Sequence, residues 1–153
     1  MNERTAILGS FSGTTVRSLA GYKPQADTAF HRDVRVYNLP IRSHAPESWR
    51  DSRFRIGPVT RAAVLGRLRS RGIGPAKARY YLDQVTDAQV EEAVARLWAD
   101  VETRVWVCLP AAQETGDARV FAHTHEQMFK MLERGAEVVF DLTDTLNSLM
   151  RRN

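Results

Sequence analysis

The amino-acid sequence predicts an α+β protein with two domains, and three observations support this. Between residues 58 and 98, apolar residues recur at helical spacing. From residue 103 onward, short apolar runs typical of strands alternate with helical patterns. Residues 1–85 contain 15 Lys/Arg and 6 Asp/Glu, a net charge of +9, whereas residues 86–153 contain 7 and 12, a net charge of −5. We therefore predict one domain over 1–85 and a small α+β module over 86–153.

The composition is that of an ordinary globular chain of 153 residues, 43% of them hydrophobic, which suffices for a packed core. No apolar run approaches the ~18 residues of a membrane-spanning helix. The first residues, MNERTAILGS, lack the pattern of a secretory signal. The one cysteine, Cys108, stands in the apolar run VWVCLP and is expected to be buried. We expect a cytoplasmic protein with no membrane partner.

The stretch AILGSFSGTTVRSLAGY near the N-terminus predicts two short helices joined by a turn. The first helix is expected over residues 3–8, the Gly- and Ser-rich turn over 9–13, and the second helix over 13–20. Ser12 is suited to cap the second helix. Gly21 is suited to end it in a left-handed conformation.

On this second helix Val16 and Leu19 are expected to face inward. Four polar residues would then be more exposed, namely Thr14, Thr15, Arg17 and Ser18. Hydroxyl and guanidinium groups on a short helix after a turn are typical of a recognition helix that meets base edges and phosphates. The pattern therefore favours a helix-turn-helix.

Residues 23–52 are interrupted by three prolines and read as mostly irregular. Alternation in DVRVYNLP predicts a strand within 33–40, and SRFRIG predicts a second strand within 52–57. Joined as a hairpin, these strands would carry Arg35, Arg53 and Arg55. A basic hairpin of this kind can contact phosphates or the minor groove. An uneven but merely solvated surface is the simpler interpretation of the same charges.

Two helices are predicted over 58–70 and 75–85, and the segment between them has two interpretations. RGIGPAKARYYL can form a helix-hairpin-helix, whose Gly-x-Gly turn binds a DNA phosphate through backbone amides. However, Ser70 stands where that motif has an apolar residue. Alternatively, Gly72 ends the first helix and Pro75 begins the second, with no ligand.

The C-terminal half contains two capping boxes, at Thr86 and Thr124, and each predicts the start of a helix. The first of these helices has an expected inner stripe of Val90, Val94, Leu97 and Trp98. Strands are predicted over 103–110, 118–124 and 137–143, and a last helix over 144–150.

The sequence gives little support for a metal site or for catalysis. His123 and His125 are a His-x-His pair, but no third ligand stands at suitable spacing, so they are expected to be polar residues at a strand end. Ser10 and Ser12 have no histidine partner implied by the pattern, and GSFSG is not a nucleophile elbow. The carboxylates of the basic half are scattered, which disfavours a nucleic-acid enzyme. We predict a non-enzyme without cofactor or metal.

The order of these parts resembles the MerR superfamily of winged helix-turn-helix regulators. In that family a first helix with a small residue leads through a turn to a Thr-Leu-Arg recognition helix, and the matching positions here are Ala6, Leu8, Phe11, Ser12, Thr15, Val16 and Arg17. SRFRI is similar to the strand that ends the family's wing. The helix pair after the wing is matched by Leu68, Arg69, Gly72, Ile73, Ala78, Arg79 and Leu82.

The resemblance implies that residues 1–85 form a winged helix-turn-helix, in a homodimeric transcription regulator that binds double-stranded DNA at the nucleoid. Thr14, Thr15 and Arg17 would enter the major groove, where arginine matches guanine. The other DNA-binding residues would lie beside the groove or on the backbone, and they are Ser12, Ser18, Lys23, Arg35, Arg53 and Arg55.

The C-terminal module is similar to the tail of MerR-like antitoxins, which leaves a second interpretation open. The chain would then be an antitoxin or adaptor that binds a protein partner, such as a toxin, through residues 86–153 and represses its own operon. Several features depart from the resemblance, among them the long loop before SRFRI and Ser18-Leu19 in place of the usual aromatic. The helix near 87–98 offers only about three turns, too short for a long dimeric coiled coil, and a single cysteine cannot form a metal-sensing set.

Overall fold

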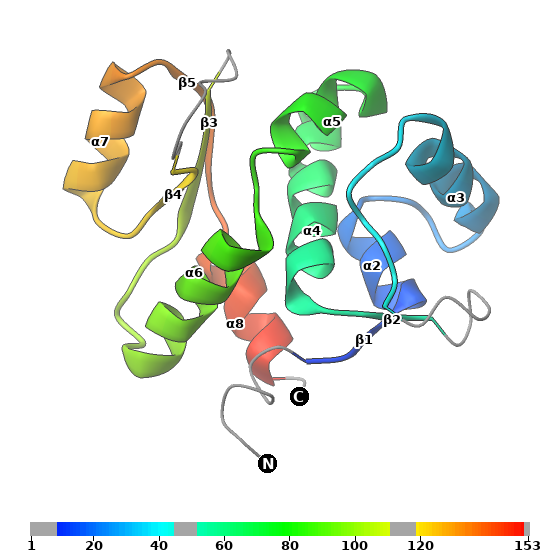
Figure 1. Cartoon of the computed structure of the whole chain (residues 1–153), viewed down its shortest axis with the longest axis horizontal. Helices are drawn as coiled ribbons and strands as arrows, with labels where there is room; N and C mark the ends of the chain where they lie inside the picture. The colour runs from blue at the N-terminus through cyan, green and yellow to red at the C-terminus, as the bar shows by residue number, and fades with distance from the viewer. Residues whose placement is uncertain (1–8, 45–51, 111–118, 152–153) are drawn as a thin grey trace. The chain divides into compact units, whose positions relative to one another are not determined.

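The computed structural model describes residues 9–44, 52–110 and 119–151. The chain divides into two compact units, Met1–Asp83 and Gln84–Asn153, which we call unit 1 and unit 2 (Figure 1). The described residues form seven helices and two small antiparallel sheets, so the fold is α+β. Within those ranges no helix combines the length and the hydropathy that crossing a membrane requires.

Unit 1 starts with a short strand, β1 (Phe11–Ser12), that leads directly into helix α2 (Gly13–Leu19). Ser12 caps the helix, because its hydroxyl oxygen accepts the backbone N–H of Thr15 at 3.2 Å. The predicted helix and its cap are confirmed. The turn predicted over 9–13 is wrong at residues 11 and 12. These two residues form β1, because they pair with a strand later in the chain.

Helix α2 ends as predicted, at a glycine in the left-handed region. Gly21 has φ +80°, and its N–H donates to the carbonyl of Ser18 at 3.0 Å. The N–H of Tyr22 donates to the carbonyl of Arg17 at 3.2 Å, so the last carbonyls of the helix are satisfied. The helix predicted over 3–8 lies outside the described residues.

The strand predicted over 33–40 is wrong, because residues 33–36 form the end of a helix, α3 (Asp27–Val36), and residues 37–40 are irregular. Phe30 and Asp33 are buried three positions apart, which is helical spacing, while Val36 is 61% exposed. Local β-propensity predicted a strand here, but the unit buries one face of a helix instead.

The second strand, β2 (Arg53–Phe54), pairs antiparallel with β1. Phe11 lies opposite Phe54, Ser12 lies opposite Arg53, and both phenylalanines are buried. The strand predicted at SRFRIG is therefore confirmed at its centre, whereas its predicted partner is wrong. Pairing with β1 buries two aromatic rings, which the predicted hairpin would not have done.

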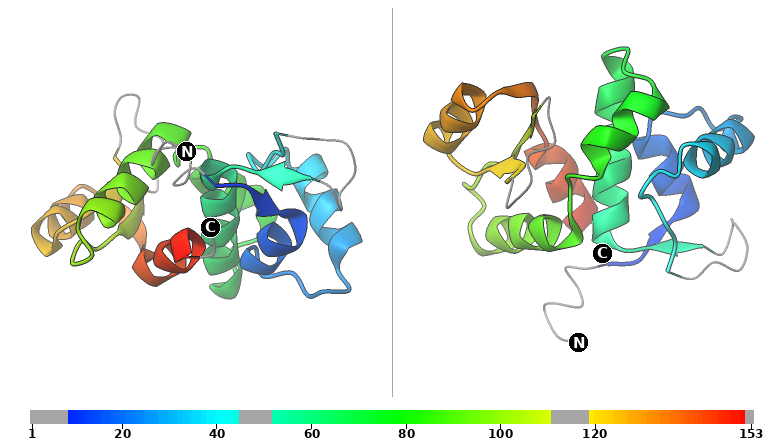
Figure 2. Two further views of the ribbon diagram at one scale, coloured as in Figure 1. Left: turned by 90° about the horizontal axis from the view of Figure 1, so that it is seen from below. Right: turned by 45° about the horizontal axis from the view of Figure 1, so that its top comes forward.

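Helix α4 (Ile56–Ser70) is the central helix of unit 1, and both α2 and α5 (Pro75–Leu82) pack against it (Figures 1 and 2). The first helix starts earlier, and the second ends earlier, than predicted. Gly72 has φ +80°, and the N–H of Ile73 donates to the carbonyl of Leu68 at 3.0 Å. Gly72 thus ends α4, as the ligand-free interpretation of RGIGPAKARYYL expected.

Unit 2 contains a three-stranded antiparallel sheet in the order β4-β3-β5. Its elements are α6 (Asp87–Ala99), β3 (Trp106–Pro110), β4 (Phe121–Ala122), α7 (His125–Glu133), β5 (Ala136–Asp141) and α8 (Thr143–Arg151). The predicted strands and helices are confirmed here with shifted ends, except that the strand predicted over 118–124 is only two residues long in the described part of the chain. Thr86 and Thr124 cap α6 and α7 through the backbone N–H groups of Gln89 and Gln127.

The two faces of this sheet differ in burial. Val107 and Leu109 lie on one face and are fully buried, whereas Trp106 points to the other face and contacts the ring of His125 on α7. Cys108 lies on the same face as Trp106 and is nevertheless buried, as predicted. None of the nine residues of α7, all of them described, is buried, so this helix covers its face of the sheet only loosely.

The inner stripe predicted for α6 is correct except at one position. Val90, Val94 and Leu97 are buried, but Trp98 is 51% exposed. Trp98 directly follows Leu97 and therefore points about 100° away from the stripe.

Candidate nucleic-acid interface

Helix α2 presents fewer polar groups than the sequence predicted. Thr14 and Ser18 are exposed, whereas Thr15 is half-buried. The hydroxyls of Ser12 and Thr15 are hydrogen-bonded to each other at 3.1 Å, so these two residues stabilise the start of the helix. Thr14 and Ser18 remain as the outward hydroxyls of α2.

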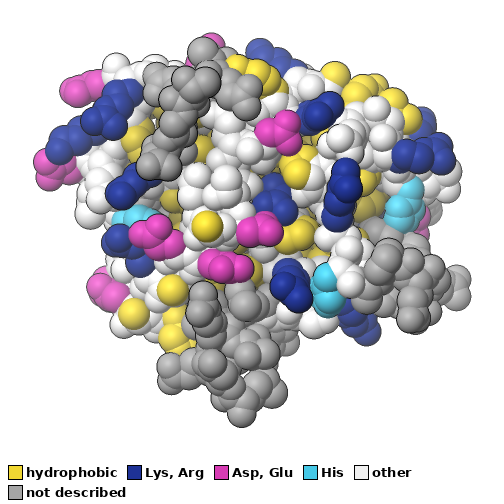
Figure 3. All heavy atoms as spheres, in the orientation of Figure 1, with side chains coloured by type: hydrophobic (Ala, Val, Ile, Leu, Met, Phe, Trp, Pro, Cys, Tyr) yellow, Lys and Arg dark blue, Asp and Glu magenta, His cyan; other side chains and the backbone are white. Residues whose placement is uncertain are grey.

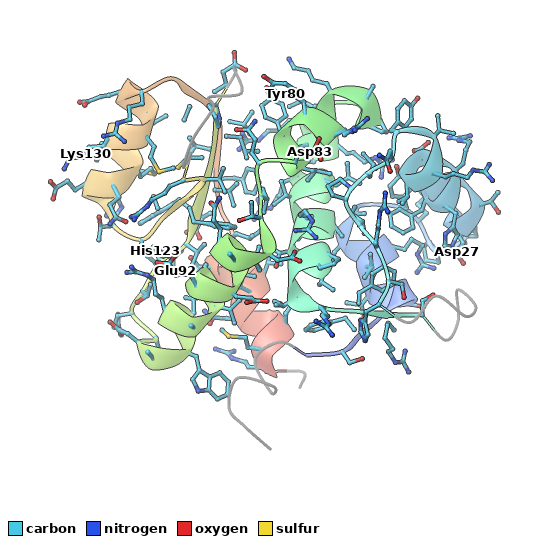
Figure 4. The ribbon with its side chains drawn as sticks, viewed as in Figure 1. Asp27, Tyr80, Asp83, Glu92, His123 and Lys130 are labelled. Atoms are coloured by element: carbon cyan, nitrogen blue, oxygen red, sulfur yellow. The ribbon has the colours of Figure 1, made fainter. Side chains whose placement is uncertain are left out.

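Arg17 was predicted to be exposed, and that is wrong. Its side chain is 9% exposed, and its Nη1 donates to the carboxylate of Asp27 at 2.7 Å and to the carbonyl of Pro24 at 3.4 Å. Asp27 is the first residue of α3 and is labelled in Figure 4. Arg17 therefore connects α2 to the start of α3, because both of these acceptors belong to the segment after α2.

Helix α3 carries a polar stripe that the sequence analysis missed. Thr28, Arg32 and Arg35 are all exposed and stand at positions i, i+4 and i+7. The opposite face holds the buried Phe30 and Asp33. Residues i, i+4 and i+7 share one side of a helix, so these three positions lie on the exposed side of α3, while the guanidinium of Arg32 also donates to Asp33.

A buried hydrogen-bond network fixes this helix. The hydroxyl of Tyr22 donates to Asp33 at 2.6 Å, and Arg32 donates to the other carboxylate oxygen of Asp33 at 3.1 Å. The rings of Tyr22 and Phe30 lie 5.2 Å apart. Burial raises the pKa of Tyr22 far above its usual range, and the hydrogen bond to Asp33 raises it further.

Strand pairing brings further arginines to the start of α2. Arg53 of β2 lies opposite Ser12, and Arg55 follows as the N-cap residue of α4; both side chains are exposed. The carbonyl of Arg53 accepts the N–H of His44 at 2.9 Å, which joins the chain before and after residues 45–51. Lys23 is exposed in the turn between α2 and α3.

The surface of unit 1 is strongly cationic. Each of the three carboxylates in its described part is paired with an arginine: Asp27 with Arg17, Asp33 with Arg32, and Asp83 with Arg79. The exposed bases of the described part are Lys23, Arg32, Arg35, Arg42, Arg53, Arg55, Arg67, Arg71, Lys77 and Arg79. Basic side chains spread over the visible face of unit 1 in Figure 3.

The two histidines of the His-x-His pair occupy different environments in unit 2. The Nδ1 of His123 lies 3.2 Å from the carbonyl oxygen of Arg104, and burial lowers the pKa of His123. The ring of His125 contacts that of Trp106 in a tilted arrangement, with the ring centres 4.7 Å apart. Among the residues that the structure describes, no three His, Cys, Asp or Glu side chains are grouped to hold a metal.

Comparisons of the chain with protein-family models, with curated proteins and with solved structures gave no match.

Proposed function

We propose that unit 1 binds double-stranded DNA and that the protein is a sequence-specific transcription regulator. The observation that carries this proposal is the exposed stripe of Thr28, Arg32 and Arg35 on α3. Helix α3 follows α2 after the connection 20–26, which is longer than the turn of about 3–4 residues in a helix-turn-helix, so its assignment as recognition helix rests on the exposed stripe. In this proposal the recognition helix is α3, whereas the sequence had favoured α2.

The chemistry of the stripe suits the major groove. Arginine donates two parallel hydrogen bonds to guanine, and a threonine offers a methyl group to thymine and a hydroxyl to phosphate. Thr28 lies in the first turn of α3, the part of a recognition helix that reaches base edges. Arg32 stays 62% exposed although it also bonds Asp33.

The residues around α3 would hold the DNA backbone. Arg53 and Arg55 lie beside the start of α2, and Lys23 lies in the turn before α3. Thr14 and Ser18 add hydroxyl donors on the exposed side of α2, the helix that crosses the backbone in a helix-turn-helix.

Alanine variants at two arginines test this proposal, with Arg96 of unit 2 as control because it is exposed and forms only a surface ion pair with Glu92. Arg35→Ala should weaken binding to the protein's own upstream DNA by ~1–3 kcal/mol and relax its base preference. Arg55→Ala should weaken binding to every duplex and lower the salt slope by about one. Arg96→Ala should change neither property. If all three variants bound DNA equally well, the surface around α3 would not be the DNA-binding surface.

Unit 2 supports a second role, the binding of a second copy or of a partner protein such as a toxin. The apolar side of α7 is open: Phe129 is 57% exposed and Leu132 is 41% exposed. Met128 and Met131 beside them are half-buried. Changing Phe129 and Leu132 to serine should convert a dimer into monomers in light scattering, or abolish capture of the product of a neighbouring gene. If the variant still formed dimers and still captured the partner protein, α7 would not be the binding surface.

A further inference from the structure

We propose that Arg69, in the last turn of α4, is a positioning residue that sets the orientation of α3 through Tyr22 and Asp33. This inference rests on the proposed function, because it concerns the helix that would read DNA. Arg69 is not itself placed among the exposed bases of that surface, since its side chain is half-buried. Its effect would pass through three side chains that contact one another.

The first contacts are between Arg69 and the turn that follows α2. The Nη1 of Arg69 donates to the carbonyl of Ala20 at 3.0 Å. The guanidinium carbon lies 3.6 Å from the centre of the Tyr22 ring, a cation–π contact. One planar group thus satisfies a carbonyl at the end of α2 and covers one face of a largely buried ring.

The next contacts connect Tyr22 to α3. Its hydroxyl donates to Asp33 at 2.6 Å, and its ring packs against Phe30. Asp33 is 8% exposed and also accepts hydrogen bonds from Arg32. Arg32 belongs to the exposed stripe, so the series of contacts runs from α4 to a residue of the candidate reading face.

Close backbone packing allows Arg69 to reach this position. Gly66 lies one turn before Arg69, and a methyl group at Gly66 would overlap the carbonyl oxygen of Leu19. A methyl group at Gly21 would lie 3.5 Å from the Nη1 of Arg69. The backbones of α2 and α4 therefore touch at this point, and a guanidinium on α4 can cover the turn between α2 and α3.

Hydrogen exchange of the full-length protein tests the inference without DNA. Arg69→Ala should raise the exchange rates of the amides of residues 30–36 about tenfold, because the loss of one cation–π contact and one hydrogen bond loosens α3. Amides in the middle of α4 should keep their protection. Arg69→Lys should restore less than half of the protection, since lysine keeps the charge but not the planar stacking group. Arg96→Ala, at an exposed arginine of unit 2, is the control.

DNA titrations of the same variants separate positioning from direct contact. Arg69→Ala should reduce affinity for the cognate duplex about tenfold with an unchanged salt slope. A slope lowered by about one would show a phosphate contact and overturn the inference. Equal loss of protection in α4 and α3 would show general destabilisation and would also overturn it. Failure of the wild-type protein to bind any duplex would remove the proposed function, while a specific change in α3 exchange would still support the positioning role.

A double-mutant cycle with Tyr22→Phe provides a second test. This variant keeps the ring under Arg69 but removes the hydrogen bond to Asp33. If Arg69 acts through Tyr22, the double variant should change α3 exchange by much less than the product of the two single effects. Independent, multiplicative effects would contradict transmission through Tyr22.

Discussion

Arg17 shows how one residue can satisfy a sequence pattern and still be used differently. Its position in Thr-Thr-Val-Arg fits a recognition helix, but its guanidinium is buried and bonded to Asp27. An exposed and a buried arginine look the same in a sequence. The choice between them depends on a carboxylate ten residues away, and only the folded turn after α2 brings that carboxylate close.

The ion pair of Arg17 leads to a stability prediction. Arg17→Ala should lower the free energy of unfolding by about 1–2 kcal/mol, because it removes a charged hydrogen bond while Asp27 stays 44% exposed and partly solvated. Urea denaturation followed by circular dichroism measures this change. Thr14→Ala is the matched control on the exposed side of α2 and should be nearly neutral. A variant as stable as the wild type would show that the pair adds nothing to the fold.

Cys108 yields a prediction about reactivity. Burial raises the pKa of its thiol to about 11, so at pH 8 the thiol stays protonated in the folded protein. In the unfolded chain the pKa returns to its ordinary value and a reactive thiolate forms. A disulfide reagent at pH 8 should therefore label the native protein slowly and the urea-unfolded protein fast. Rapid labelling without urea would contradict a buried Cys108.

At the scale of the elements, the packing of α2 on α4 depends on Gly66. Gly66→Ala should destabilise the protein by about 3 kcal/mol, since the new methyl group would overlap the carbonyl of Leu19. Helix propensity alone would predict a gain of ~1 kcal/mol. Gly74→Ala is the control, because a methyl group there meets nothing within 4 Å. Thermal unfolding of the two variants decides between the effects, and a stabilised Gly66→Ala would contradict the close contact.

Sequence signals within a few residues predicted most helices and strands, but they did not predict which strands pair. Ser12, Thr86 and Thr124 each marked the start of a helix, because the cap bonds lie within three residues. The partner of β2 could not be predicted, since β1 lies some forty residues earlier and each strand has only two residues. In α3, valines and alternating charges suggested a strand, and tertiary burial of Phe30 and Asp33 decided for a helix.

The same limit applies to the candidate site. Arg53 and Arg55 were predicted from the alternating pattern of SRFRIG, and both are exposed, with Arg53 opposite Ser12 at the start of α2. Thr28 and Arg32 were missed, although their spacing with Arg35 would have revealed them had the segment been assigned as a helix. Because part of α3 was predicted to be a strand, the stripe of Thr28, Arg32 and Arg35 was not predicted.

At the scale of the whole molecule, charge separates the two units. Unit 1 carries most of the exposed bases of the described residues, and the acidic residues are concentrated in the second half of the sequence. An acidic unit is repelled by DNA, so it is suited to dimerisation or to a protein partner rather than to the duplex.

Truncation tests this division of roles. A chain ending at Asp83 should remain basic, bind DNA weakly and sediment as a monomer, because it lacks unit 2. Analytical ultracentrifugation gives the mass of the fragment and of the full chain. A full-length dimer whose fragment is also dimeric would show that unit 2 does not form the dimer interface.

The central claim is sequence-specific DNA binding, and an anisotropy titration tests it most directly. The purified protein is titrated with its own upstream DNA and with a scrambled duplex, each at two salt concentrations. We predict tighter binding to the upstream DNA and a steep loss of affinity with salt, because several arginines would neutralise phosphates. Equal, salt-sensitive binding to both duplexes would contradict sequence specificity, and no binding to either would show that the basic surface of unit 1 is not a DNA interface.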